Sequence, residues 1–272
     1  MTQAIAFIGG GNMASAIIGG LLKQGMTPDQ ILVVEPFDEA RTKLKDNFGI
    51  AALSAPDATL ERAGLVVWAV KPQTFKDAAA QTKTFTAHAL HLSVAAGIRS
   101  DSIAAWLGSE RVIRCMPNTP ALIGKGMTAL FPRASVTAAD RQWAGDVIAT
   151  TGQFLWLERE EQLDAVTALS GSGPAYVFYF LEAMRAAGTE MGLPADQAYQ
   201  LAVATFIGAG ELARASSEPP EVLRQRVTSK GGTTYAAITS MDESGIQASF
   251  AKALHAARDR ATEMGKAFGS AA

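Results

Sequence analysis

The stretch Ile5–Ala16, which reads IAFIGGGNMASA, carries the strongest structural signal in this chain. Its first four residues, Ile5–Ile8, are apolar and predict a short strand that is buried on both faces. Three glycines, Gly9–Gly11, follow this strand, and a helical run extends from Met13 to Leu22. The stretch therefore predicts a strand, a glycine-rich turn and a helix in succession.

Three small residues of this stretch fit the G-x-G-x-x-[G/A] pattern of a dinucleotide-binding turn. Gly9 permits a tight turn, Gly11 lets a pyrophosphate approach the main chain, and Ala14 allows the helix to pack closely on the strand. The free N–H groups at the helix start would face the phosphates. Glu35 ends a second apolar strand at the distance expected of a ribose-binding carboxylate. We therefore expect a bound dinucleotide; the alternative is a glycine-rich turn without a ligand.

Composition limits the class of protein. The chain has 272 residues and is 48% hydrophobic, which suits one large domain or two modest ones. A net charge of −2 argues against a nucleic-acid surface. No apolar run reaches the roughly 20 residues that span a bilayer. We therefore expect neither a nucleic acid nor a membrane as partner.

Cysteine and histidine usage bears on compartment and metals. The one cysteine, Cys115, excludes a disulfide within the chain and favours a reducing compartment. The sequence shows no leader pattern before its first strand, so we expect a cytoplasmic protein. His88, His91 and His255 have no metal-ligand spacing, and we expect no metal site.

Apolar runs alternate with helical segments over the first half of the chain. Runs that are apolar on both faces, with helices between them, predict a parallel sheet covered on both sides. Asp38 is expected to cap a helix that extends to Phe48. We expect a Rossmann-type, mostly parallel α/β domain over residues 1–161. Its further strands are Ile31–Val34, Leu65–Val70, Ala89–Val94, Arg111–Met116, Met127–Phe131 and Phe154–Leu157, with helices over Gln73–Gln81 and Asp101–Leu107.

Unusual short segments follow three of the predicted strands. They are Val70–Pro72, Ala95–Gly97 and Pro117–Thr119. The carboxyl ends of parallel strands meet at one edge of a sheet, which is where ligands of such folds bind. We therefore expect the three segments to line one crevice, although each alone would be an ordinary turn.

From about Gln162 the pattern changes to long, alanine-rich helical runs. The helix expected from Ala195 is apolar over most of its circumference, and the remaining chain is too short to cover it. We therefore expect an all-helical dimerisation domain over residues 162–272 and a homodimer; the alternative is a helix buried in its own bundle. The expected helices are Leu163–Met191, Ala195–Ser216, Pro220–Thr228, Thr233–Met241 and Ile246–Phe268.

Two motifs interrupt this helical half. Ser170–Tyr176 contains two glycines and a proline, and an interior proline costs a helix about 3 kcal/mol. We interpret it as two helices that meet at a kink, with Pro174 in the first turn of the second. Ser229–Thr234 contains Gly–Gly, which would end one helix, and two threonines that can cap the next. Such a helix start suits a small carboxylate; the alternative is a plain joint between helices.

Side by side, these motifs resemble those of the pyrroline-5-carboxylate reductase family over essentially the whole chain. The resemblance implies reduction of 1-pyrroline-5-carboxylate to L-proline with NADH or NADPH, the last step of proline synthesis. It also implies a helical domain that interlocks with that of a second subunit, and dimers that can gather into decamers. The segments that carry it are IAFIGGGNM at 5–13, AVKP at 69–72, AAG at 95–97, RCMPNTP at 114–120, DAVTALSGSGPAY at 164–176 and VTSKGGTT at 227–234.

The resemblance implies two groups of site residues. The cofactor would contact Ile8, Gly9, Gly10, Gly11, Asn12, Met13, Ala69, Val70, Lys71, Pro72, Ala95, Ala96, Gly97 and Asn118. The substrate would contact Ser229, Gly231, Gly232, Thr233, Thr234 and Glu160, and would face the nicotinamide bound by the partner subunit.

Two positions depart from the family pattern. Lys230 stands where the family usually has proline, which loosens the turn and adds a charge near the expected carboxylate site. At the end of the second predicted strand, Glu35 and Pro36 stand where the family often has Asn-Arg or a serine-rich segment when NADPH is used. A carboxylate at Glu35 would bind a ribose 2′-hydroxyl and repel a 2′-phosphate, which favours NADH, but Arg41 lies close in sequence.

Hydride transfer to C5 of a cyclic imine is easier when the imine nitrogen is protonated. Thr234 is our candidate for a catalytic hydrogen bond to that nitrogen, whereas Lys71 is favoured as a cofactor contact. Two other functions stay open at this point. A β-hydroxyacid dehydrogenase would carry a lysine in a long helix, but none lies between Leu163 and Thr228. A non-catalytic nucleotide sensor would use 229–234 only as a joint.

Overall fold

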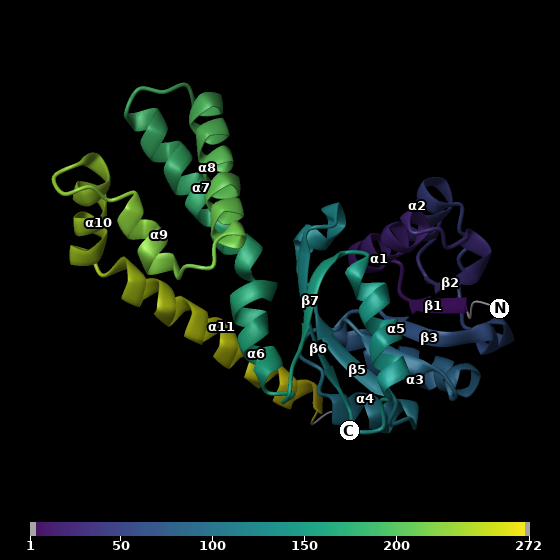
Figure 1. The fold of residues 1–272 in the computed structure, drawn as a ribbon. Helices are drawn as coiled ribbons and strands as arrows, with labels where there is room; N and C mark the ends of the chain where they lie inside the picture. The colour runs from purple at the N-terminus through teal and green to yellow at the C-terminus, as the bar shows by residue number, and fades with distance from the viewer. Residues whose placement is uncertain (1–3, 270–272) are drawn as a thin grey trace. The chain divides into compact units, whose positions relative to one another are not determined.

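The computed structural model describes residues 4–269 (Figure 1). It divides into two compact units: the first extends to Gly173 and includes the end of the chain from Ala257, and the second is Pro174–Ala256. These limits differ from the expected domains 1–161 and 162–272, because the segment after residue 161 and the end of the last helix belong to the sheet-containing unit.

The first unit is built around a seven-stranded sheet in the order β2-β1-β3-β4-β5-β6-β7. Strands β1 to β5 are parallel, β6 is antiparallel to β5, and β7 is parallel to β6. The predicted mostly parallel sheet is thereby confirmed. The strands are β1 (Ala4–Ile8), β2 (Ile31–Val34), β3 (Ala63–Trp68), β4 (Leu90–Ser93), β5 (Val112–Met116), β6 (Gly126–Pro132) and β7 (Gly152–Trp156).

Helices cover both faces of this sheet (Figure 1). Phe7 lies in the core beneath α1, α2 and α5, and Trp68 lies in the opposite core beneath α3 and α4; both side chains are fully buried. Because both faces are covered, the central strands are apolar on both sides. The elements are α1 (Asn12–Lys23), η1 (Pro28–Gln30), α2 (Asp38–Phe48), η2 (Ala58–Arg62), α3 (Pro72–Thr86), α4 (Ser100–Leu107), η3 (Thr119–Ile123), α5 (Ala138–Ala149) and α6 (Gln162–Val166).

One of these helices, α5, is not predicted by the apolar pattern. It starts with a capping box, in which Asp140 N donates to Thr137 Oγ1 at 3.1 Å and Thr137 N donates to the Asp140 carboxylate at 3.0 Å. The sequence Thr-x-x-Asp is the signal that could have revealed this helix. Its presence between β6 and β7 provides the crossover that makes these two strands parallel.

Two predicted helix caps are wrong. Asp38 is the first residue of α2, and the N-cap position belongs to Phe37, without a side-chain cap. Thr233 and Thr234 are likewise the first two residues of α10 (Thr233–Glu243), and Gly232 is its N-cap. In both cases the N-cap residue lies one or two positions before the predicted cap, so the polar side chain lies inside the first turn.

The predicted kink after residue 170 is confirmed. A π-helical segment, η4 (Thr167–Gly171), follows α6, and α7 (Gly173–Glu190) begins a new helix with Pro174 in its first turn. A proline in the first turn of a helix removes no intrahelical hydrogen bond, so the expected cost of an interior proline does not arise.

The second unit contains the rest of α7, α8 (Ala195–Ala215), α9 (Pro220–Arg226), α10 and the first part of α11 (Ile246–Gly269). Its apolar surface is incompletely covered. In α8 only Ala198 and Ala202 are buried, whereas Leu201 and Leu212 are 58% and 71% exposed. A single chain therefore leaves α8 uncovered, as its sequence predicts. Among the described residues, no helix combines the length and the hydropathy that crossing a lipid bilayer requires.

Candidate active site

The direction in which strands are added reverses between β1 and β3, because β2 lies on the other side of β1. Open α/β sheets bind ligands beyond the strand ends at such a switch point. Gly9 directly follows β1 with a φ of +95°, and an added Cβ would lie 2.6 Å from the carbonyl oxygen of Ala69, which follows β3. Only glycine allows the ends of these two strands to come so close.

The next two glycines are constrained differently. A Cβ on Gly10 would lie 2.6 Å from Cδ1 of Leu44, whereas a Cβ on Gly11 would have no atom within 4 Å. Gly11 is the N-cap of α1, has an ordinary φ of −73°, and provides no side-chain cap. The packing of the protein itself does not require glycine at position 11. The open space above the N–H groups at this helix start therefore fits the approach of a pyrophosphate.

Glu35 follows β2, and its carboxylate is turned inward toward this glycine turn. The residue is only 6% exposed. Its Oε2 accepts a hydrogen bond from Gly10 N at 2.8 Å, and its Oε1 accepts one from Phe37 N at 3.0 Å. Each carboxylate oxygen is thus bound to a main-chain N–H, so the carboxylate holds the glycine turn in place, and the predicted ribose contact of Glu35 stays a prediction.

The other predicted cofactor segments follow β3 and β4 at the same edge of the sheet. Ala69 and Val70 are half-buried, and exposed Lys71 is the N-cap of α3, whose first residue is Pro72. Ala69 N donates to Ile8 O at 2.8 Å, which extends the pairing of β3 with β1 beyond the strand end. The structure therefore brings these residues next to the glycine turn.

The loop Ala95–Gly97 follows β4 and packs against the end of α11. Ala95 is buried, and its N–H donates to Ser93 Oγ at 3.3 Å. Gly97 has a φ of +75°, and a Cβ there would lie 3.1 Å from Cβ of Met264. The helix end therefore limits the space on this side of the loop to that of a glycine.

Asn118 joins two motifs that are far apart in sequence. Its Nδ2 donates to the carbonyl and hydroxyl oxygens of Ser170 at 3.2 and 3.3 Å, and its Oδ1 accepts from Met127 N at 2.9 Å. A side chain on Gly171 would overlap Met116. The π-helical segment thus lies directly on the carboxyl end of β5. The predicted contact of Asn118 with the cofactor stays a prediction.

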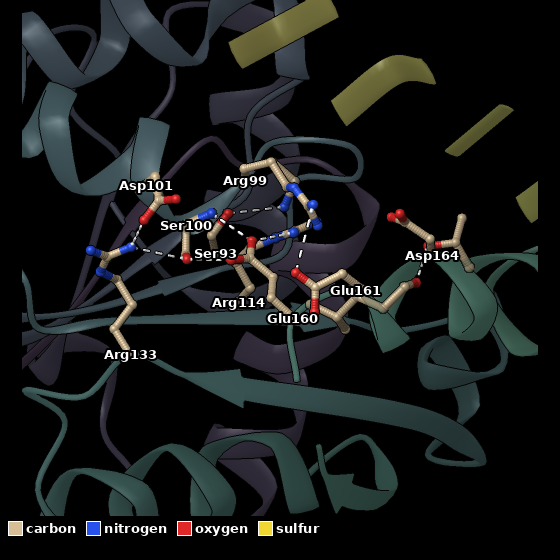
Figure 2. A network of polar contacts seen from close by, with 12 residues as sticks. Ser93, Arg99, Ser100, Asp101, Arg114, Arg133, Glu160, Glu161 and Asp164 are labelled. Atoms are coloured by element: carbon tan, nitrogen blue, oxygen red, sulfur yellow. Dashed lines mark hydrogen bonds and ion pairs between the residues drawn. The ribbon is translucent and has the colours of Figure 1, made fainter. Parts of the chain in front are cut away.

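Glu160 is the centre of a buried polar network in the first unit (Figure 2). Its carboxylate accepts hydrogen bonds from Ser100 N at 2.7 Å and Ser100 Oγ at 2.6 Å, and it pairs with Arg114 at 2.5 Å. Burial alone would raise the pKa of Glu160, but the hydrogen bonds from Ser100 and the charge of Arg114 outweigh it and lower the pKa below its usual value. The predicted substrate contact of Glu160 stays a prediction.

The network continues on both sides of this carboxylate (Figure 2). Arg133 donates to Ser100 Oγ at 3.2 Å and pairs with Asp101 and with Glu110. On the other side, Arg99 pairs with Glu161 at 3.8 Å. A separate hydrogen bond, from Thr262 Oγ1 of α11 to the Asp164 carboxylate at 2.9 Å, joins α6 to the end of α11. The start of α4 is therefore tied to β5, to the residue that follows β6 and to the segment that precedes α6.

In the second unit, the segment 229–234 forms a turn that ends in a helix start. Gly232 N donates to Ser229 O at 3.0 Å, and Gly231 has a φ of +74°. The preceding helix, α9, already ends at Arg226, so the prediction that Gly–Gly ends it is wrong. Lys230 is exposed and Thr234 is half-buried. The turn thus presents the first N–H groups of α10, two threonines and a lysine, which suits a small carboxylate.

Two further features of the described residues bear on the chemistry. Among residues 4–269, no three or more histidine, cysteine, aspartate or glutamate side chains gather as they would around a metal ion. Cys115 is buried, and this burial raises the pKa of its thiol to about 12, so it stays protonated at neutral pH.

A mostly parallel sheet with a glycine turn at its switch point, followed by a helical part, defines the chain as a dinucleotide-binding protein of the Rossmann type. Comparison with known families agrees with this class. Residues 4–97 match the family model described as NADP oxidoreductase coenzyme F420-dependent. Residues 160–264 match the model described as pyrroline-5-carboxylate reductase dimerisation.

Individual relatives cover almost the whole chain. It is 44% identical to pyrroline-5-carboxylate reductase of Pseudomonas aeruginosa, over 98% of this chain and 99% of the relative, and 36% identical to that of Escherichia coli, over 98% and 100%. The solved structure from Coxiella burnetii is 35% identical with a TM-score of 0.89, over 97% of this chain and 99% of that chain. A Plasmodium falciparum structure with NADP bound is 26% identical with a TM-score of 0.87, over 97% of this chain and 98% of that chain. The chain belongs to the pyrroline-5-carboxylate reductase family.

Proposed function

We propose that the chain reduces 1-pyrroline-5-carboxylate to L-proline, with the cofactor at the β1–β3 switch point and the substrate on the 229–234 turn. The activity and the use of NADH or NADPH follow from family membership. The observation that carries the cofactor site is Gly11, because its missing side chain leaves open space at a helix start. No contact among the residues that the structure describes accounts for that glycine, whereas an approaching pyrophosphate does.

Three segments would hold the cofactor. The glycine turn from Ile8 to Met13 would bind the pyrophosphate, while Ala69–Pro72 and Ala95–Gly97 would border the nicotinamide half. When bound, the nicotinamide supplies a hydride. The contribution of these residues is alignment, which in well-oriented reactions is worth several kcal/mol of the barrier.

The substrate would be held by the start of α10. The N–H groups of Thr233 and Thr234 would bind the carboxylate, and exposed Lys230 adds a positive charge beside them. The Thr234 hydroxyl would hydrogen-bond to the ring nitrogen and orient it. The hydride goes to C5, the C=N π-electron pair moves to nitrogen, and the proton on nitrogen makes the product a secondary amine.

The chain self-associates through its helical part, which matches a dimerisation family and leaves the apolar side chains of α8 exposed. We place the substrate turn of one subunit opposite the nicotinamide of the other in a homodimer. Dimers would further gather into decamers in the cytoplasm, where the reduced thiol of Cys115 would persist.

The direct test is to mix the purified protein with 1-pyrroline-5-carboxylate and either NADH or NADPH, and to follow the absorbance of the reduced nicotinamide. We expect loss of absorbance that requires both the imine and the protein, with L-proline as product. A β-hydroxyacid with oxidised cofactor is the control substrate. Turnover of that acid, or nucleotide binding without turnover of the imine, would overturn the proposal in favour of a dehydrogenase or a nucleotide sensor.

A further inference from the structure

Several charged side chains lie at the end of β2, and they differ in burial and in hydrogen-bond partners. Glu35 is buried and binds Gly10 N and Phe37 N through its two carboxylate oxygens. The Asp38 side chain, three residues later, is 91% exposed. In dinucleotide-binding folds this strand end lies beside the adenosine ribose, whose 2′ substituent distinguishes NADH from NADPH.

Arg41 is held in place at this same strand end. Its Nη1 donates to Glu35 O at 2.9 Å and to Pro36 O at 2.7 Å, and its Nη2 pairs with the Asp38 carboxylate. Two main-chain carbonyls therefore fix the guanidinium whether or not Asp38 is present. Its side chain remains 22% exposed, which leaves part of it accessible to a ligand.

We propose that Glu35 is a positioning residue that holds Gly10 in the turn for both cofactors, and that the pair Asp38–Arg41 reads the 2′ substituent. This inference rests on the proposed cofactor site. The Asp38 carboxylate accepts a hydrogen bond from a 2′-hydroxyl and repels a 2′-phosphate, while the fixed Arg41 guanidinium attracts the phosphate. Cofactor preference is thus set by the opposed effects of these two charged side chains on the 2′ substituent, and not by Glu35.

This assignment separates three variants in a binding experiment. Isothermal titration calorimetry with NAD⁺ and NADP⁺ on the purified full chain gives both dissociation constants without turnover. For Glu35→Gln we expect both constants to rise by a similar factor of about ten or more, because an amide NH₂ replaces one acceptor of a main-chain N–H. The ratio of the two constants stays unchanged.

The other two variants change the ratio in opposite directions. Asp38→Asn removes the repulsion of the 2′-phosphate and also removes the counterion of the Arg41 guanidinium. NADP⁺ therefore binds at least severalfold more tightly relative to NAD⁺. Arg41→Gln weakens NADP⁺ relative to NAD⁺. The matched control is Glu39→Gln, which removes the same charge next to Asp38 but breaks a pair with Lys43, at 2.7 Å, on the exposed face of α2. It leaves the ratio unchanged.

Several outcomes overturn the inference. A Glu35→Gln protein that loses NAD⁺ affinity while gaining NADP⁺ affinity shows that Glu35 reads the ribose. Unchanged ratios in both Asp38→Asn and Arg41→Gln show that the pair does not distinguish the 2′ substituents, and these two variants stay informative if Glu35→Gln fails to fold. Wild-type protein that binds neither nucleotide refutes the proposed cofactor site instead.

Discussion

The main-chain N–H of Ser100 donates a hydrogen bond of 2.7 Å to Oε1 of Glu160, across 60 residues of sequence. Ser100 is the first residue of α4, so the carboxylate lies at the positive end of that helix. The same carboxylate pairs with Arg114 of β5. Glu160 therefore fixes the helix that directly follows the loop Ala95–Gly97, one of the proposed cofactor segments.

Replacing Glu160 by glutamine should destabilise the first unit strongly. Glutamine still accepts a hydrogen bond from Ser100, but it leaves the Arg114 charge, whose side chain is 7% exposed, without a counterion. Breaking a buried pair in this way costs on the order of 3 kcal/mol. Denaturant unfolding at one fixed protein concentration measures the change, since self-association contributes to apparent stability.

The neighbouring residue provides the control for this prediction. Glu161 is 68% exposed and lies 3.8 Å from Arg99. For Glu161→Gln we expect a loss within about 1 kcal/mol, as for other surface pairs. Equal, small losses in both variants would contradict the buried role assigned to Glu160.

His91 should make the stability of the fold depend on pH. Its burial, with the nearby charges of Arg111 and His88, lowers the pKa of His91 from 6.5 to about 4. The folded state thus favours the neutral ring of His91. The contribution of this ring to the free energy of unfolding is complete above pH 6.5 and is lost as the pH falls from 6.5 toward 4. The shift corresponds to about 3 kcal/mol.

The variant His91→Asn tests this by removing the titrating group. Its unfolding free energy should vary less between pH 6.5 and pH 4 than that of the wild type, even though it loses the 3.1 Å hydrogen bond from Trp68 Nε1 to His91 Nδ1. His255→Asn, at an exposed position of α11, is the control and should keep the wild-type pH dependence. Identical slopes for all three proteins would refute the role of His91.

The sequence predicts features that depend on a few neighbouring residues. The apolar runs around Ile5–Ile8 and Ile31–Val34 locate strands, because a strand buried on both faces has no polar side. The glycine turn is predicted because a positive φ at Gly9 is a local backbone requirement. The kink before Pro174 is predicted because a proline inside a helix is a local backbone conflict as well.

Features that depend on distant residues escape the sequence. The bonds from Asn118 to Ser170 and from Gly10 to Glu35 join segments 52 and 25 residues apart, and no spacing rule links them. Glu35 is the instructive case: its position at the end of β2 predicts a ribose contact, but only the structure shows that its carboxylate is turned inward. A residue's place in a motif fixes its Cα neighbourhood and leaves its side-chain direction open.

Gly11 and Gly9 should respond differently to the same substitution. Gly11→Ala adds a Cβ with no atom within 4 Å and an ordinary φ, so stability should change by less than about 1 kcal/mol. The same methyl group occupies the space of the pyrophosphate, and we expect cofactor affinity to fall about tenfold or more.

Gly9→Ala, with a φ of +95° and a Cβ 2.6 Å from Ala69 O, should lose at least 1–2 kcal/mol of stability, roughly the cost of a left-handed non-glycine residue with a clash. Thermal unfolding and nucleotide titration separate the two effects, and a Gly11→Ala protein with full affinity would remove the main argument for the cofactor site.

The role proposed for Thr234 is tested by removing its hydroxyl group. Thr234→Ala should lower kcat/KM for 1-pyrroline-5-carboxylate by tenfold or more, about 1.4 kcal/mol of transition-state stabilisation, because the ring nitrogen loses its hydrogen bond. The dissociation constant of the cofactor should barely change, since the hydroxyl group is assigned to the substrate nitrogen and not to the cofactor. Thr234→Ser keeps the hydroxyl and should retain most of the activity. If the serine variant is as slow as the alanine variant, the methyl group is what matters at this position, and the hydrogen bond to the imine nitrogen has to be assigned to another residue.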